Sequence, residues 1–315
     1  MEAAAISAAP EAPAAVPPAP RTAVDRSIII HVLLVHLLGL GLAPLTFSRE
    51  GVVAFLALYL FAGFGVTAGA HRLFTHRSFV PRPILREILA FAFLMSAQGS
   101  LHRWVRDHAI HHRYADQDGD PHAPVPNGFW FAHLSWMWTQ PATRSEDRSL
   151  YLRWTRGLDP GRVGRFFRTA PRIAAFHLFI VLAVFTLGTL LGTWRTGVSV
   201  VVWGVFLRIV IAMHSTFLVN SATHLWGRRR YATVDESRNL GWVAVLALGE
   251  GWHNNHHHRP AAANNGFHAW WEFDATFLLL VAFGAAGLLT DLKVFRPAQG
   301  RMDTWFPSAP SRLAG

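Results

Sequence analysis

Histidines gather in four short segments of this sequence, at spacings that suit metal binding. The segments are HRLFTH at 71–76, HAIHH at 108–112, NSATH at 220–224 and HNNHH at 253–257. Residues three and four positions apart share one face of a helix, so each HxxHH segment is expected to direct three imidazoles to one point. Neutral imidazole is a good ligand for iron, zinc and copper. A metal site is therefore predicted.

The number of these histidines predicts two metal ions that share one site. A single zinc ion takes four ligands, and this set is larger. His71 and His76 are five positions apart, which an ideal α-helix does not align, so that pair predicts a helix end or a local distortion. Few carboxylates lie nearby, which argues against a carboxylate-bridged di-iron bundle. The candidate ligands are His71, His76, His108, His111, His112, His224, His253, His256 and His257.

The elements that must position these histidines are predicted to be membrane spans. Four blocks are almost free of charged residues, and a helix needs about 20 residues to cross the hydrocarbon core. The blocks are 27–48, 51–70, 173–194 and 196–227, the last broken by Arg208 alone. Buried core helices of a large soluble protein are the alternative, but such long blocks in two closely spaced pairs favour membrane spans. Arg208 is expected to extend to the outer membrane interface, with a role beside a substrate tunnel as the alternative.

The positive charge of the chain predicts its topology. The formal net charge is +10, and segment 71–172 between the second and third spans carries 15 arginines, whereas the two short turns contain only Arg49 and Arg195. Lys and Arg favour the cytoplasmic side of a membrane, so we expect both termini and every histidine segment to be cytoplasmic. Nucleic acid is not predicted as a partner, because topology already explains the basic charge.

The chain divides into a membrane domain and two tails. Residues 1–26 are rich in Ala and Pro and are expected to be disordered, residues 27–295 form one all-α membrane domain, and residues 296–315 are expected to be a loose C-terminal tail. Within the domain, the short apolar segment 84–97 predicts an interfacial or buried helix rather than a span. The sequence contains no cysteine, which excludes disulfides and thiolate ligands from this chain.

The order of the motifs resembles the membrane-bound acyl-CoA desaturases of the stearoyl-CoA delta-9 type. The resemblance rests on HRLFTH, WVRDHAIHH, NSATH and GEGWHNNHH, together with DPH at 120–122 and FLR at 206–208, and it extends from about residue 28 to residue 290. The HxxxxH and HxxHH motifs are shared with other membrane di-iron oxygenases, whereas the NSxxH and GEGWHNxHH settings are specific to desaturases. The resemblance implies an all-α integral membrane fold, in which four transmembrane helices support a cytoplasmic helical cap that holds a dimetal site.

The resemblance also implies cofactors and partners. The nine histidines would hold two iron ions, and Asn220 would reach one of them through water. O₂ would be the co-substrate, because no side chain can break two unactivated C–H bonds by acid–base chemistry. The sequence lacks the HPGG motif of the fused haem domain that some members carry, so an external ferredoxin or cytochrome b5-like donor with its reductase is implied. The implied reaction introduces a cis double bond, expected at delta-9, into a saturated fatty acyl chain.

The head group of the substrate is where the sequence departs from the resemblance. Trp104, Arg106 and Asp107 match the family's WxRDH segment, and Arg106 would meet a phosphate of CoA. Gly99 and Phe217 stand where the eukaryotic acyl-CoA enzymes have an Asn and a Trp near the substrate. An acyl-CoA is the expected substrate, and acyl chains on glycerolipids or on carrier protein are the alternatives.

Other histidines and one acid are expected to have supporting roles. Glu250 is expected to hydrogen-bond a ligand histidine, and His122 is expected to make a hydrogen bond that is structural or that supports the ligands. His258 breaks the face pattern of the ligands and is expected to lie behind them or in solvent. His31 and His36 lie inside the first span and are expected to face neighbouring helices. A hydroxylase is the nearest alternative function, because the same oxidant can return oxygen to the chain. A metal transporter or scaffold would need ionisable residues along the spans, whereas these histidine segments lie at one end.

Overall fold

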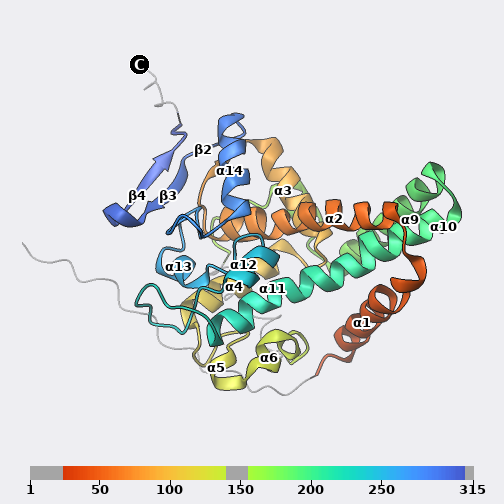
Figure 1. The fold of residues 1–315 in the computed structure, drawn as a ribbon, viewed down its shortest axis with the longest axis horizontal. Helices are drawn as coiled ribbons and strands as arrows, with labels where there is room; N and C mark the ends of the chain where they lie inside the picture. The colour runs from red at the N-terminus through yellow and green to blue at the C-terminus, as the bar shows by residue number, and fades with distance from the viewer. Residues whose placement is uncertain (1–23, 140–154, 309–315) are drawn as a thin grey trace, which may run out of the picture.

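The computed structural model describes residues 24–139 and 155–308. Three of its helices are long and apolar enough to cross a membrane, namely Arg49–Thr75, Ala170–Leu191 and Trp194–Leu225. They correspond to the second, third and fourth predicted spans, and in Figure 1 they run lengthwise through the molecule. The tail predicted at 1–26 lies almost entirely outside the described residues.

The first predicted span is shorter than the other three. Helix α1 (Arg26–His36) continues into the π-helical turn η1 (Leu37–Gly41), and the two together are apolar but do not reach the length of the other spans. The 3-10 turn η2 (Pro44–Thr46) begins at a proline, which cannot continue the preceding helix. Large apolar side chains of α1 and η1 are exposed, among them Ile30, Leu33 and Leu37. The expectation of four long spans is therefore confirmed for three of them.

Two of the long helices change their hydrogen-bond pattern along their length. The second span begins as α2 (Arg49–Phe64) and ends as the π-helix η3 (Gly65–Thr75). The last span is built from α10 (Trp194–Val201), the π-helix η6 (Val202–Leu207) and α11 (Arg208–Leu225). Helix α9 (Ala170–Leu191) packs tightly on α10, because a Cβ at Gly188 would lie 3.0 Å from the Cα of Gly197.

Arg208 does not extend to the outer interface, so that prediction is wrong. Its side chain is completely buried at the η6–α11 junction. The guanidinium donates to the carbonyl of Gly204 at 3.2 Å and to the carbonyl of Met95, the last residue of helix α3 (Pro83–Met95). The last carbonyls of a helix lack partners within that helix, and Arg208 satisfies one of them instead of seeking water. The arginine thereby ties the last span to the cap.

The cap is built on three helices that pack against η3. They are α3 (Pro83–Met95), α4 (Leu101–Tyr114) and α14 (Ala275–Ala285). Their apolar faces share one core, which includes Leu85, Phe93, Leu101 and Leu280. Segment 84–97 thus forms a short helix with one buried face and one exposed apolar face, in agreement with the prediction of an interfacial or buried helix rather than a span. The shorter helical elements are α5 (Pro124–Asn127), α6 (Phe129–His133), η4 (Ser135–Met137), α8 (Gly161–Phe166), α12 (Gly241–Leu246), α13 (His253–His258) and η7 (Pro297–Gln299).

The domain is not all helical, which corrects the all-α expectation. Two antiparallel strand pairs lie beside α14, formed by β1 (Val80–Pro81) with β2 (Leu289–Thr290) and by β3 (Leu292–Arg296) with β4 (Arg301–Trp305). Strand β4 lies within the predicted loose tail, and Gly300 makes the turn between β3 and β4 possible with a φ of +63°. The described part of that tail therefore has regular structure.

Candidate metal centre

A π-helix resolves the five-residue spacing of His71 and His76. The amide of His76 donates to the carbonyl of His71 at 3.1 Å, which is the i to i+5 bond of a π-helix. The two rings therefore lie near each other, with centroids 4.8 Å apart. The predicted local distortion is confirmed, and η3 is its physical form.

The HNNHH segment folds into α13 because its two asparagines bind the loop around it. The side-chain oxygen of Asn254 accepts hydrogen bonds from the amides of Arg230 and Tyr231, both at 2.7 Å. The side-chain amide of Asn255 accepts from Asn239 at 2.8 Å. These contacts hold the short helix on the side away from its histidines. The histidines of α13 are then free to face α4 and η3.

The nine predicted ligands converge in two groups rather than at one point. Within each group the nearest ligand atoms all lie within 4.8 Å of one another. Each HxxHH segment is divided between the groups: α4 contributes His111 to one and its other two histidines to the other. The five-histidine group is His71, His76, His108, His112 and His256, and the four-histidine group is His111, His224, His253 and His257.

The ring nitrogen that points to the centre of each group is Nε2. In the five-histidine group, Nε2 of His71 lies 3.0 Å from Nε2 of His256. In the four-histidine group, Nε2 of His224 lies 3.0 Å from Nε2 of His253. This arrangement brings the lone pairs of several imidazoles to one place, which is how histidines bind a metal ion.

Four carboxylates contact the opposite ring nitrogen, Nδ1, of ligand histidines. The distances are 3.0 Å for Asp120 to His111, 2.8 Å for Asp116 to His224, 2.9 Å for Asp235 to His257 and 2.8 Å for Glu250 to His71. A carboxylate accepts hydrogen bonds, so Nδ1 of each histidine holds the proton and Nε2 presents a lone pair. Glu250 has the role predicted for it.

One pair of histidines tests whether a cation fits the site. Nε2 of His111 and Nε2 of His257 lie 3.3 Å apart, and each ring has a carboxylate at its Nδ1. Both nitrogens that face each other are therefore lone-pair acceptors, which cannot hydrogen-bond to each other. A metal ion between such nitrogens removes the conflict. The donor set, which is entirely nitrogen, fits iron and other imidazole-binding metals.

Burial keeps most of the candidate ligand imidazoles neutral. Burial lowers the pKa of His257 to about 4, although Asp235 opposes the change. His111 differs, because its acidic neighbours, Asp120 first, outweigh burial and raise its pKa. Burial, and then the neighbouring imidazoles, hold the pKa well below the ordinary value for His76, His108, His112, His253 and His256.

Sequence reasoning missed three of the four carboxylates. Asp116 and Asp120 lie in the acidic turn DQDGD that follows α4, and this turn places them beside the histidines of the four-histidine group. Asp235 lies in the loop after α11 and is hidden in a segment with no motif. An acid-rich turn directly after HxxHH was a usable signal for the first two.

Two other histidines lie near the site but apart from its centre. The ring of His122 packs beside His111 with centroids 4.5 Å apart, and its Nδ1 lies 3.7 Å from Asp120. The backbone amide of His122 donates to the carboxylate of Asp120 at 3.1 Å, so His122 helps to position the carboxylate that contacts His111. His258 stacks on Tyr231 with centroids 4.0 Å apart and belongs to neither group. His258 therefore lies apart from the other histidines of α13, as its break in the i, i+3, i+4 spacing predicts.

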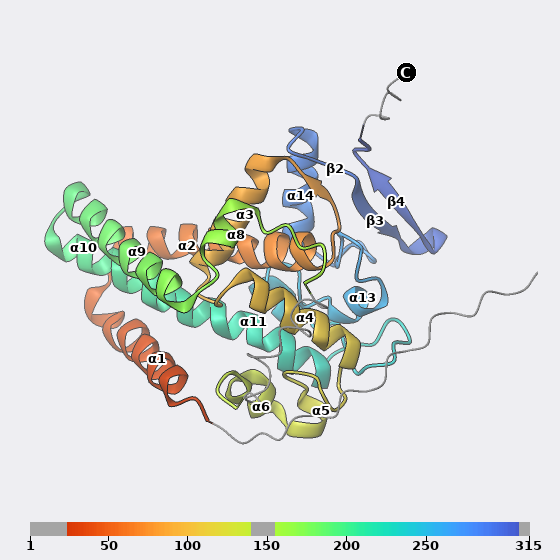
Figure 2. The same cartoon turned by 180° about the vertical axis from the view of Figure 1, so that it is seen from behind.

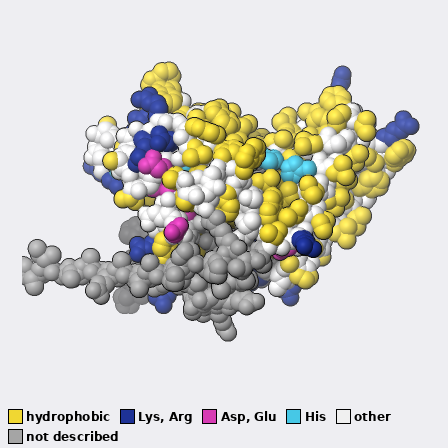
Figure 3. Space-filling view, turned by 90° about the horizontal axis from the view of Figure 1, so that it is seen from below, with side chains coloured by type: hydrophobic (Ala, Val, Ile, Leu, Met, Phe, Trp, Pro, Cys, Tyr) yellow, Lys and Arg dark blue, Asp and Glu magenta, His cyan; other side chains and the backbone are white. Residues whose placement is uncertain are grey.

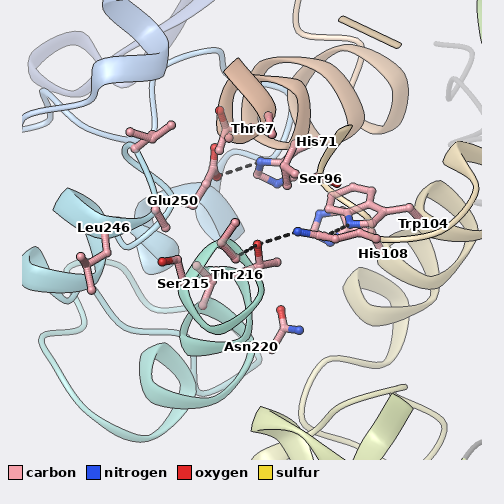
Figure 4. Close-up of a pocket in the computed structure, with 18 of the residues that line it drawn as sticks. Thr67, His71, Ser96, Trp104, His108, Ser215, Thr216, Asn220, Leu246 and Glu250 are labelled. Atoms are coloured by element: carbon pink, nitrogen blue, oxygen red, sulfur yellow. Dashed lines mark hydrogen bonds and ion pairs between the residues drawn. The ribbon is translucent and has the colours of Figure 1, made fainter. Parts of the chain in front are cut away.

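Two cavities reach the metal centre from different sides. The α2 cavity, of about 60 Å³, lies between α2, α11 and α12, and the α1 cavity, of about 220 Å³, lies between α1, α4 and α11. Both are mainly apolar in their lining. Figure 4 shows His71, Trp104, His108 and Asn220 around the first of them. The residues that line both cavities are Ser96, Gln98, Trp104, His108, Thr216 and Asn220.

A hydrogen-bonded trio lies where the two cavities meet. Nε1 of Trp104 donates to Gln98 at 3.0 Å, and the amide nitrogen of Gln98 donates to Thr216 at 2.9 Å. The ring of Trp104 stacks on the ligand candidate His108, with centroids 4.9 Å apart. This trio fixes the passage beside the five-histidine group. Asn220 also lies there, one helical turn before His224.

The predicted substrate residues separate into two sets. Trp104 lines both cavities, and Asp107 and Phe217 line the α1 cavity. Arg106 is buried, and its guanidinium contacts the carboxylate of Asp107 at 2.7 Å. Among the described residues, Arg106 is not part of the lining of either cavity. Its expected contact with a CoA phosphate therefore has no support in this geometry.

Comparison with known proteins relates the whole histidine centre to one family. Residues 50–288 match the family model described as fatty acid desaturase. The chain is 40% identical over 252 residues to the sn-1 stearoyl-lipid 9-desaturase of Anabaena variabilis, covering 80% of this chain and 87% of that protein. It is 37% identical over 287 residues to the chloroplastic palmitoyl-monogalactosyldiacylglycerol delta-7 desaturase of Arabidopsis thaliana, covering 88% of this chain and 71% of that protein.

An acyl-CoA enzyme is also among the relatives. The chain is 35% identical over 272 residues to the acyl-CoA C20 Delta5-desaturase of Anemone leveillei, covering 84% of this chain and 82% of that protein. The relatives thus support the desaturase family that the motifs predict, but not specifically its stearoyl-CoA branch. The family match covers all four histidine segments. It also covers the three long apolar helices, apart from the first residue of Arg49–Thr75. This chain belongs to the fatty acid desaturase family of membrane oxidoreductases.

Proposed function

We propose that this protein is an O₂-dependent acyl-lipid desaturase that introduces a cis double bond, at delta-9, into an acyl chain of a membrane lipid. The observation that carries the proposal is the position of the two histidine groups, which lie where two apolar cavities meet. A saturated chain that occupies both cavities passes beside His108 and Trp104. That is the placement which oxidation of an internal CH₂–CH₂ pair requires.

The nine histidines are proposed to hold two iron ions, with Asn220 reaching one of them through water. The irons, when bound, supply the activation of O₂ and the oxidising power for the C–H bonds. The protein residues bind and orient them: each carboxylate at Nδ1 fixes the tautomer of its histidine and directs Nε2 inward. The apolar cavity walls exclude water from the chain and from the oxidant.

The balance of the reaction requires an external electron donor. The chain loses two hydrogen atoms, and with two further electrons and two protons these reduce one O₂ to two waters. The described residues bear no cysteine or haem motif that would store electrons in this chain. We propose a ferredoxin or cytochrome b5-like protein with its reductase as donor. We further propose that the metal centre and both termini face the cytoplasm, as the arginine distribution predicts.

A lipid-linked substrate is better supported than the acyl-CoA that the motifs favour. Two of the relatives above are named for lipid-linked chains. Arg106, the expected phosphate contact, forms an ion pair with Asp107 instead. Gly99 lines the α1 cavity without a side chain to meet a head group, and a Cβ built there would have open space around it. Neither Gly99 nor Arg106 therefore offers the cavity a group that would contact a nucleotide.

The test is the order in which labelled products appear in a host that lacks its own desaturase. Cells that express the protein receive a pulse of labelled stearate, and monounsaturated chains are measured in intact glycerolipids and in acyl-CoA. The proposal expects the label in glycerolipids first, with the double bond at delta-9. His224→Ala is the matched inactive control.

Three results would contradict the proposal in distinguishable ways. Label that appears first in acyl-CoA would return the substrate to the acyl-CoA class. Hydroxylated chains in place of alkenes would make the protein a hydroxylase. Purified protein that binds one zinc tightly, and does not exchange it for iron, would contradict the oxidation chemistry itself.

A further inference from the structure

The helical segment formed by α1 and η1 touches the last span at its η1 end and diverges from it at the other end. Gly39 packs against the backbone of that span, since a Cβ at Gly39 would lie 3.0 Å from the amide nitrogen of Leu207. From this contact the ribbons of α1 and α11 separate toward the cap (Figure 2). The α1 cavity, of about 220 Å³, occupies the space between them. The two backbones can approach this closely because glycine has no side chain at position 39.

Each long wall of this cavity is one face of a helix. Residues at helical spacings of three and four share a face, and such faces normally pack directly on each other. The lining from α1 is Ile28, His31, Val32, Val35 and His36, and the lining from α11 is Ile209, Met213, Thr216, Phe217 and Asn220. Two complementary faces are therefore held apart along about two turns of helix. We call the part of the α1 cavity between these two helix faces the slot.

Hydrogen bonds between histidines hold the two walls in place. Nε2 of His36 lies 3.0 Å from Nε2 of His214 on α11, and Nδ1 of His214 lies 2.9 Å from Nε2 of His133 on α6. Nδ1 of His36 lies 2.7 Å from the carbonyl of Val32, so this nitrogen donates. Nε2 of His36 therefore accepts from Nε2 of His214, and Nδ1 of His214 accepts from Nε2 of His133. These histidines belong to neither candidate metal group, and their bonds tie α1, α6 and α11 together.

The slot leads from the apolar surface of the protein to the metal centre. At its inner end it shares Gln98, Trp104 and His108 with the α2 cavity. At its outer end lies His31, the one exposed histidine among all 18, every one of which is in the described ranges. Figure 3 shows histidine side chains at the surface within a field of hydrophobic ones. Neighbouring α1 side chains such as Leu33, 63% exposed, face outward as lipid-facing residues do.

We propose that the acyl chain enters sideways from the bilayer, through the slot between α1 and α11, while it remains attached to its glycerolipid. This inference rests on the proposed acyl-lipid function and adds the route and the binding site. Imidazole N–H of His31 and the guanidinium of Arg103, which also lines the slot, supply donors for the ester and glycerol oxygens. A tethered chain needs such a lateral route because its second chain stays in the membrane. A CoA thioester would come from water and would not need a wall made by α1.

Photolabelling tests the route without turnover and without iron. The protein is placed in vesicles that contain a glycerolipid with a photoreactive diazirine in its sn-1 stearoyl chain, and the adducts are mapped by mass spectrometry. We expect adducts on the lining residues of α1 and α11. Val32→Trp fills the slot from α1 and should reduce these adducts at least tenfold. Leu33→Trp adds the same ring on the outward face and should leave them unchanged. Thermal unfolding is measured for both variants.

A second wall variant and a second substrate separate the possible failures. Met213→Trp fills the slot from α11 and should act like Val32→Trp, which covers the case in which one variant does not fold. Equal labelling in Val32→Trp, Met213→Trp and Leu33→Trp would overturn the route. Wild-type protein that desaturates stearoyl-CoA but not the vesicle lipid would overturn the acyl-lipid function instead. Lipid desaturation that survives both wall variants would overturn the route and leave the function intact.

Discussion

The two histidine groups contain the same kind of ligand but differ in what surrounds it. In the four-histidine group, three of the four imidazoles have an aspartate at Nδ1. In the five-histidine group, Glu250 contacts one imidazole, His71, and shares its charge with Arg72 at 3.1 Å. A carboxylate at Nδ1 raises the basicity of the ligand and offsets the charge of a metal. We therefore expect the four-histidine group to bind its metal more tightly.

The cavities reinforce this difference between the two groups. His108 of the five-histidine group lines both cavities and stacks on Trp104, which belongs to the trio at their junction. From the four-histidine group, His111 and His253 line the smaller α2 cavity. The five-histidine group thus has more contact with the space for the acyl chain, and the four-histidine group has more carboxylates at its imidazoles. Two metal sites with the same ligand type are expected to differ in affinity for this reason.

The largest expected effect comes from removing one ligand from each group. His112→Ala and His224→Ala should each lower desaturation by more than about 100-fold, because loss of a ligand exceeds the loss of an outer partner. Iron should fall from roughly two to roughly one per chain in each variant, since a two-metal site loses one member. Metal analysis of purified protein, with circular dichroism as the folding control, measures this. Retention of both irons in His224→Ala would remove it from the ligand set.

Replacing the outer carboxylates tests the comparison directly. Asp235→Asn should weaken iron binding in the four-histidine group by about 10- to 100-fold, because an amide does not fix the tautomer of His257 as a carboxylate does. Glu250→Gln should have a smaller effect on metal binding, since it supports one ligand of five. Titration with a competing chelator measures both affinities. Equal losses in the two variants would show that the carboxylates do not distinguish the groups.

The pH dependence of the metal-free protein should have opposite signs for the two kinds of histidine. His112 has a folded-state pKa well below 6.5, so the unfolded chain binds more protons below about pH 6.5 and stability falls as the solution is acidified. His111 has a raised pKa, so its contribution is present at low pH and is lost as the pH rises. Thermal unfolding between pH 8 and pH 5 measures the slope.

Two variants isolate these contributions to the pH dependence. His112→Gln should flatten the loss of stability on acidification, whereas His111→Gln should steepen it. The number of histidines with lowered pKa exceeds the number with raised pKa, so the wild-type melting temperature should fall on acidification. A melting temperature that rises from pH 8 to pH 5 would contradict the buried, neutral state of the five-histidine group.

The smallest effect is expected at His258, beside the four-histidine group but outside it. His258→Ala removes a ring that stacks on Tyr231 and should cost about 1 kcal/mol of stability, as for other aromatic pairs. Iron content and desaturation should remain near wild type. His257→Ala, one position earlier, is the matched comparison and should lose metal. A loss of iron in His258→Ala would extend the ligand set beyond the nine histidines.

Much of the fold and of the site could be predicted from local sequence patterns. Uncharged blocks identified the three long spans, because crossing a bilayer demands about 20 apolar residues in one run. Histidine spacing identified which imidazoles come together. The division of each HxxHH segment between two groups could not be predicted, because neighbours at i+3 and i+4 diverge slightly around a helix and other elements decide which metal each one meets. Arg208 was misjudged because the carbonyl of Met95, its partner, is 113 positions away.

The sequence by itself determined the desaturase family, the apolar helices long enough to cross a membrane and the nine histidines that the structure brings together. These properties follow from side-chain type and from periodicity within single helices. The tertiary structure alone decided which carboxylates support which histidines, that η3 is a π-helix, that Arg106 is buried against Asp107, and that α1 and α11 enclose a slot. The pairing of Asp116 with His224, the pairing of Glu250 with His71 and the slot all depend on contacts between residues far apart in the chain. Local periodicity contains no information about such contacts.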